Sequence, residues 1–144
     1  MQHAITFSIV NYLRVATGIN AIWLFDGVKL PAEKPFITVE QMQNGESFIS
    51  KGRETARTIH RFQVGYHAST ASDRAFKQSE LTDIFKFDEF DLLDTTQLPA
   101  PIIGSFLCDL TAVTPISPEN VADVTNYHRV YFDIEVDRTY NRRR

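Results

Sequence analysis

Three carboxylates near the C-terminal end of the sequence have a spacing that permits metal chemistry. Asp133, Glu135 and Asp137 alternate with apolar residues, and alternate side chains of a strand lie on the same face. Clustered carboxylates can bind Mg²⁺ for phosphodiester cleavage, so a Mg²⁺-dependent nuclease is one hypothesis. Nuclease sites of this kind usually place a lysine beside the second acid, and Val136 stands there instead. We favour a face devoted to solubility or to salt bridges between subunits.

Other combinations of reactive side chains give weaker signals. His60 and His67 are separated by an odd number of residues, so on one strand they lie on opposite faces and do not share a metal. Cys108 is the only cysteine, which excludes an intrachain disulfide, and we expect it to be a small buried side chain. The 6 glycines are scattered and form no phosphate-binding loop. Residue chemistry alone therefore indicates no reaction, no metal and no cofactor.

The three carboxylates belong to a segment, residues 128–137, that alternates strictly between apolar and polar side chains. The apolar set is Val130, Phe132, Ile134 and Val136, and the polar set is Arg129, Tyr131, Asp133, Glu135 and Asp137. This pattern predicts a long strand with one face on a core and the other toward water or a partner.

The remaining elements are predicted from their apolar spacing and their end signals. Apolar residues at helical spacing predict a first helix that ends near Gly18, and Thr70 with Asp73 predicts the capped start of a second helix that runs to about Phe85. Its inner side is predicted to comprise Ala75, Leu81, Ile84 and Phe85. Strands are expected at 36–42, at 59–68 in the centre of the sheet, at 87–94 as an edge strand, and at 105–114; a single helical turn is expected at 117–119.

These elements predict one α+β domain. The expected architecture is a mixed, mostly antiparallel sheet of about four to six strands with two main helices packed on one face. A chain of 144 residues with 43% hydrophobic content is enough for one core. No apolar run approaches the roughly 20 residues that cross a bilayer, so we expect a soluble, unexported protein with no membrane partner.

Residues 44–58 form a segment rich in glycine, hydroxyl and charged side chains, in which Phe48 and Ile49 are the only large apolar residues. Two interpretations remain open. The segment is either an ordinary long hairpin loop or an arm that becomes ordered against another subunit.

Charge is unevenly distributed along the sequence. The net charge is -3, but without Arg138, Arg142, Arg143 and Arg144 there are 15 - 4 = 11 basic residues against 18 acidic ones. We therefore divide the chain into a domain at 1–137 and a basic tail at 138–144, which is either solvated or in contact with a polyanion or an acidic neighbour. Residues 80–94 carry 6 acids and one lysine, which disfavours nucleic-acid binding by the body.

Three segments resemble small tail-completion proteins of long-tailed bacteriophages, also called tail terminators or tail-to-head joining proteins. They are Phe36-Ile-Thr-Val, the strand at 59–68 with the capped helix that follows it, and Thr125-Asn-Tyr-His-Arg-Val-Tyr-Phe-Asp-Ile-Glu-Val. The similarity lies in element order, length and strand character from about Ile5 to Asp137. No diagnostic motif anchors it.

The resemblance implies a structural virion protein without catalytic activity, located in the tail or neck and assembled in the host cytoplasm. Members of the family form a hexameric ring on the last ring of tail-tube protein, stop tube growth and present a surface to the head connector. DNA would pass through the ring without sequence-specific binding, which suits an acidic body. The alternatives are a head-completion or neck adaptor protein of the same virion, the nuclease above, and a cellular adaptor with a similar sheet.

The interface hypothesis rests on charge and position, because the family provides no residue-level motif. Phe48 and Ile49 would anchor the 44–58 segment on a neighbouring copy, and Lys51, Arg53 and Arg57 would meet acids such as Asp133 and Glu135. Arg142, Arg143 and Arg144 would touch DNA or an acidic tube subunit.

Overall fold

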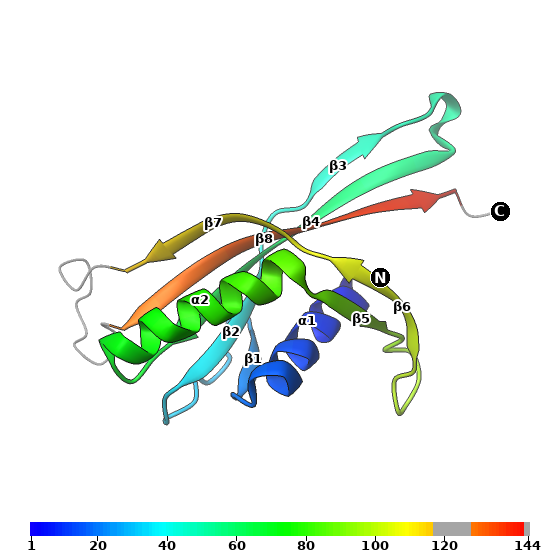
Figure 1. Cartoon of the computed structure of the whole chain (residues 1–144). Coiled ribbons are helices and arrows are strands. Elements are labelled where there is room, and N and C mark those ends of the chain that lie inside the picture. Colours follow the sequence, from blue (N-terminus) through cyan, green and yellow to red (C-terminus); the bar gives the residue numbers. More distant parts are fainter. Residues whose placement is uncertain (117–127, 143–144) are drawn as a thin grey trace.

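The computed structural model of the chain describes residues 1–116 and 128–142. Over these residues it is a single α+β domain, as predicted, with two helices, a six-stranded mixed sheet and a small two-stranded sheet (Figure 1). The helices are α1 (Gln2–Thr17) and α2 (Ala71–Phe87). The strands are β1 (Ala21–Leu24), β2 (Phe36–Gln41), β3 (Gly45–Phe48), β4 (Thr55–His67), β5 (Glu89–Leu93), β6 (Ile102–Leu107), β7 (Asp109–Pro115) and β8 (Arg129–Asn141).

The main sheet has the order β1-β2-β4-β8-β7, and β3 pairs with the N-terminal part of β4. Only the β1–β2 pair is parallel within the described sheet. β4 and β8 are paired along their whole length, from Thr55 opposite Asn141 to His67 opposite Arg129. This long pair places β4 in the centre of the sheet, as its sequence predicted.

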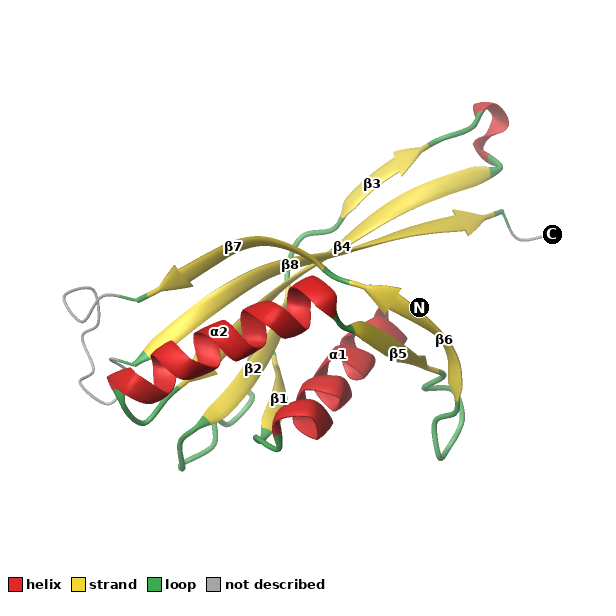
Figure 2. Cartoon of the chain, viewed as in Figure 1, coloured by secondary structure: helices red, strands yellow, loops and turns green. Residues whose placement is uncertain are grey.

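Both helices cover the same face of the main sheet (Figure 2). Ile5, Ile9 and Leu13 of α1 are fully buried, and α1 ends at Gly18, whose positive φ of 71° suits glycine. The predicted apolar face of β8 is buried as well, and Phe132 and Ile134 lie opposite Val64 and Phe62 of β4. The period of two along β8 thus produced the expected core face and polar face.

α2 begins as predicted, because the Thr70 hydroxyl accepts a hydrogen bond of 3.1 Å from the Asp73 backbone N–H. Leu81, Ile84 and Phe85 are buried. The prediction was wrong for Ala75, which is exposed on the outer side of the helix.

Two strands differ from the predictions. The acidic segment after α2 is not an edge of the main sheet: β5 pairs with β6 in a separate sheet that packs on α1, where Leu93 N–H donates to Ser8 Oγ at 2.9 Å. The strand expected at 105–114 is two strands, β6 and β7, separated at the buried Cys108. The chain changes sheets at that point, which no local pattern signals.

The expected basic tail is largely strand. β8 continues past Asp137 to Asn141, because Arg138 to Asn141 pair with Thr55 to Thr58 of β4. Only Arg142 follows the strand within the described chain. The helical turn expected at 117–119 and the last two arginines, Arg143 and Arg144, lie outside the described residues.

Candidate interaction site

A three-stranded arm projects from the body of the domain (Figure 1). It consists of β3, the first residues of β4 and the last residues of β8, and we call it the β arm. The last β7 partner of β8 is Asp109, opposite Glu135, so 141 - 135 = 6 residues of β8 extend beyond the body sheet. At a strand rise of about 3.4 Å per residue, the β arm is about 20 Å long. Its position makes it available for contact with another molecule.

The tip of the β arm combines exposed apolar and cationic side chains. Phe48 and Ile49 are each 57% exposed, and as consecutive residues of an extended segment they lie on opposite faces of the arm. The Arg53 guanidinium lies 4.9 Å from the centroid of the Phe48 ring, a cation–π contact. Lys51 is exposed beside it. The two residues proposed as anchors are therefore accessible, but they do not share one face.

The 44–58 segment is a hairpin, which agrees with the first of the two interpretations. β3 pairs with β4 from Gly45 opposite Ile59 to Phe48 opposite Ala56. A single 3-10 turn at Lys51–Arg53 connects the strands, with positive φ values of 74° at Gly52 and 58° at Arg53. The positive φ at Arg53 costs about 1 kcal/mol relative to a favoured backbone conformation. The turn imposes this conformation on Arg53, and in it the guanidinium lies over Phe48.

A buried histidine fixes the base of the β arm to α1. One ring nitrogen of His60 lies 2.6 Å from Gln2 Oε1 and the other lies 2.8 Å from the Tyr140 hydroxyl. Burial lowers the pKa of His60, so the imidazole is neutral at pH 7 and uses one nitrogen as donor and the other as acceptor. Asn44 also donates to Gln2 Oε1, at 2.9 Å. The arm and the helical layer are joined here.

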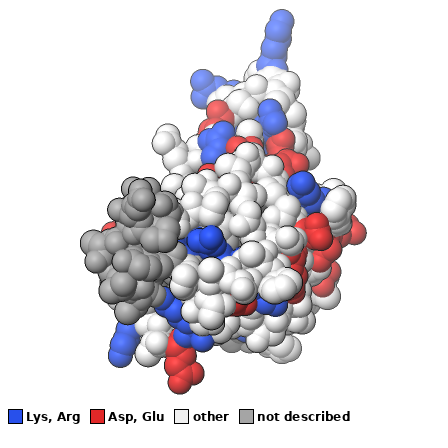
Figure 3. Space-filling model, turned by 60° about the vertical axis from the view of Figure 1, so that its left-hand side comes forward, with Lys and Arg blue, Asp and Glu red and all other residues white. Residues whose placement is uncertain are grey.

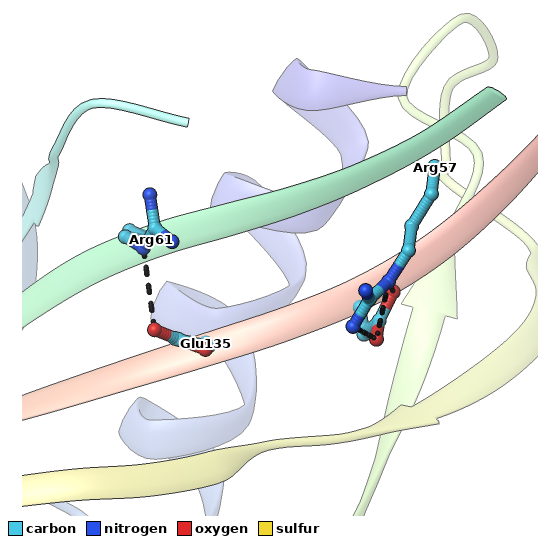
Figure 4. Close-up of polar contacts among 4 residues, drawn as sticks. Arg57, Arg61 and Glu135 are labelled. Atoms are coloured by element: carbon cyan, nitrogen blue, oxygen red, sulfur yellow. Dashed lines mark hydrogen bonds and ion pairs between the residues drawn. The ribbon is translucent and has the colours of Figure 1, made fainter. Parts of the chain in front are cut away.

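The three carboxylates of the nuclease hypothesis share the open face of the sheet, but each lies beside a polar partner from β4. Arg61 Nε lies 3.2 Å from Glu135 Oε1, and Gln63 Nε2 donates to Asp133 Oδ1 at 3.2 Å. Figure 4 shows Arg61 beside Glu135, with Arg57 further along the same two strands. One oxygen of Glu135 and one of Asp133 are thus already engaged by a side chain of β4.

The pair at the end of this row is the tightest. Arg57 Nη2 lies 2.6 Å from Asp137 Oδ2 and Arg57 Nε lies 2.9 Å from Asp137 Oδ1, which is a bidentate contact. The hydrogen bonds from Arg57 lower the pKa of Asp137. Arg57 is thus engaged within its own chain, whereas we expected it to meet Asp133 or Glu135 of a neighbour. Among the described residues no group of three or more His, Cys, Asp or Glu side chains is arranged to hold a metal ion.

The other end of the same face is closed by aromatic packing. His67 is buried and stacks on Phe36, with ring centroids 4.4 Å apart. Burial, with Arg129 and Lys34 as further causes, lowers the pKa of His67 to about 4. His60 and His67 lie on opposite faces, as predicted, and both are buried, which the alternation of the sequence did not indicate.

A groove runs between α1 and the β5–β6 sheet, and sequence reasoning missed it. It has a volume of about 290 Å³ and is lined by Ser8, Asn11, Tyr12, Val15, Ala16, Asp91, Leu93 and Ile102. Its rim is apolar and accessible, since Val15 is 76% and Ile102 64% exposed. Tyr12 donates to Asp88 Oδ2 at 2.7 Å, and burial together with this bond raises its pKa to about 12. The groove exists because β5 packs on α1, a contact between distant segments.

The β arm carries basic and acidic side chains together, and a separate group of acids lies on the body. Figure 3 shows Lys and Arg atoms at the projecting end and a group of Asp and Glu atoms on the body. The acids of residues 80–94 belong to the C-terminal part of α2, to β5 and to the loop after it. Arg142 lies at the arm and approaches Glu54, with Nη1 3.5 Å from Oε1, so it does not form a free tail.

Cys108 is buried, as predicted, and burial raises the pKa of its thiol to about 12. A thiol with this pKa stays protonated at neutral pH, so it is a poor nucleophile. Neither described helix is long and apolar enough to cross a bilayer.

Comparison of the sequence with protein-family models found no match, and comparison with curated proteins found no significant match.

Proposed function

We propose that this chain is a structural virion protein that caps the phage tail tube as a homohexameric ring and joins the tail to the head connector. The observation that supports this proposal most is the β arm, which carries exposed Phe48 and Ile49 about 20 Å beyond the body sheet. An accessible apolar tip on a projecting arm is suited to contact between subunits. The α+β fold agrees with the architecture expected from the resemblance to tail-completion proteins.

The charge distribution is consistent with a passage for DNA. The acidic body repels phosphate, so DNA can move past it without binding. The carboxylates of β8 do not favour the nuclease alternative, because Arg57 and Arg61 already neutralise Asp137 and Glu135.

The proposal predicts that the purified chain arrests the growth of tail tubes. Phage tail-tube protein is assembled with and without the chain, and tube length and tube ends are examined by negative-stain electron microscopy. We expect shorter tubes with ring-shaped density of sixfold symmetry at one end. Tubes that keep elongating, with bare ends, would contradict the proposal.

The same preparation separates the two virion alternatives. A tail terminator binds tubes in the absence of heads, whereas a head-completion or neck adaptor protein binds filled heads before tails attach. For the nuclease alternative, incubation with plasmid DNA and Mg²⁺ is decisive: we expect no nicking, and nicking that disappears in Glu135→Ala would reject the structural proposal.

A further inference from the structure

We propose that the β arm of one copy docks in the groove between α1 and the β5–β6 sheet of the next copy, with Phe48 in the groove and Arg53 facing Asp91. This inference rests on the proposed ring, since it names the surfaces through which the copies would join. It identifies the occupant of the groove as a second copy of this chain.

The core-side face of the arm carries a row of side chains that the two helices do not cover. Phe48 lies opposite Ala56, and Ala56 lies opposite Tyr140, so these three residues form a row across the three strands. They occupy the face that carries the core residues further along β4, but the row lies beyond the helices and Phe48 stays 57% exposed. The surface of the core layer thus continues into a partly exposed strip, in which Arg53 lies over the Phe48 ring and Tyr140 contacts His60.

The groove has the size and polarity to accept one such side chain. Its volume of about 290 Å³ is at the lower limit of small-molecule pockets, which suits an inserted aromatic side chain better than a metabolite. Its exposed apolar residues, Val15 and Ile102, would be covered by the incoming strip. Aromatic side chains that fill a pocket at the centre of an interface contribute a large share of the binding energy.

The charges match at the same place. Arg53 lies over the Phe48 ring, so a cation accompanies the aromatic side chain wherever it inserts. Asp91 lines the groove and is exposed, and it has no ion-pair partner among the described residues. A cation beside an aromatic ring therefore meets an acid beside an apolar groove, which fixes both position and orientation.

The contact would be head to tail. Arm and groove are different surfaces of the chain, so each copy uses its arm on one neighbour and its groove on the other. Such heterologous contacts generate a closed ring when the rotation between copies closes, and a filament when it does not. In a closed ring every arm and every groove would be occupied.

Charge reversal tests this docking. Sedimentation equilibrium of the full chain, up to millimolar concentration, compares wild type with Arg53→Glu, with Asp91→Lys and with the double variant that carries both changes. We expect each single variant to weaken self-association by at least about tenfold and the double variant to recover most of it, because every arm and every groove then carries the opposite charge. Phe48→Ala, which removes the anchor, should weaken association without being rescued by Asp91→Lys.

Asp26→Lys is the matched control, since it makes the same charge reversal at an exposed residue of the turn after β1. It should leave association unchanged. Far-ultraviolet circular dichroism confirms that each variant is folded. If rings form only on tube ends, the same variants are scored by the fraction of capped ends. Single variants that associate like wild type, or a double variant that is no better than either single one, would overturn the docking.

The failure of this inference and the failure of the proposed function give different results. Capped tubes that are insensitive to all three charge reversals leave the tail function standing and reject the arm contact. Recovery in the double variant, together with tubes that keep growing, supports the arm contact and rejects the tail function. A chain that is monomeric under every condition rejects both.

Discussion

At the scale of single residues, the structure separates the buried titratable groups from the exposed ones. His67 is a buried aromatic side chain whose Nδ1 has no hydrogen-bond partner within the described chain, and burial keeps it neutral. The carboxylates of β8 are partly accessible and are held by arginine and glutamine side chains of β4. The first group sets the pH dependence of stability, and the second sets the charge of the open face.

We predict that His67 makes the fold weaken as the pH falls. Its pKa is about 4 in the folded chain, below the ordinary value of 6.5, so between these pH values the unfolded chain binds the proton more readily. The free energy of unfolding therefore falls as the pH drops from 6.5 to 4, by up to about 3 kcal/mol from this residue. His67→Phe keeps the stacking on Phe36 and should flatten this part of the curve, measured by urea unfolding at several pH values. Equal slopes in both proteins would contradict the prediction.

Among the elements, the long pair β4 and β8 lies at the centre of the main sheet and contributes to both of its faces. Side chains pack especially tightly at one position of the open face. Tyr131 lies opposite Gly65, and its ring covers the glycine. A β-carbon added at Gly65 would lie 2.7 Å from Thr38 Oγ1 and 2.9 Å from Tyr131 Cε1. This glycine is required by close packing between three neighbouring strands rather than by backbone conformation.

Gly65→Ala is therefore expected to destabilise the domain by about 1–3 kcal/mol, because both neighbours must move to admit the methyl group. Gly104→Ala in β6 is the matched control, since its added carbon would meet only Leu92 Cδ2 at 4.0 Å. The control should change stability by less than about 1 kcal/mol. Thermal unfolding of both variants measures the difference, and a similar cost at the two sites would show that strand propensity, not crowding, governs Gly65.

At the scale of the whole molecule, stability and interaction are located in different parts. The buried core is built from α1, α2 and the body portion of the sheets, and its members do not include Phe48, Ile49 or the other residues of the arm tip. The β arm is joined to this body through the paired strands β4 and β8 and through His60 at its base. Changes at the tip of the β arm are therefore expected to leave the fold intact.

Replacement of residues 49–55 by Asn-Gly, a two-residue hairpin turn, should leave the body folded. We expect the free energy of unfolding to change by no more than about 1 kcal/mol, because exposed loop residues contribute little to stability. Self-association should weaken by at least about tenfold, because Arg53 is removed while Phe48 stays in place. Calorimetry and sedimentation of the variant measure the two effects separately. A large loss of stability would show that the arm tip belongs to the folding unit.

Elements with local signals could be predicted from the order of the amino acids. The apolar spacing of α1, the hydroxyl cap at Thr70 and the strict alternation of β8 each indicated an element and its buried face, because side-chain periodicity is a property of the backbone geometry alone. The α+β class followed from the order of these elements. The exposure of Phe48 and Ile49 also followed, because they lie in an otherwise polar segment.

Contacts between distant segments could not be predicted in this way. The pairing of Arg57 with Asp137, the burial of His67 against Phe36, the extension of β8 to Asn141 and the groove between α1 and β5 all join residues that are far apart in the chain. No local pattern contains these contacts. They arise because the whole chain must bury its apolar surface and satisfy its backbone hydrogen bonds at the same time, and only the complete fold shows which solution does both.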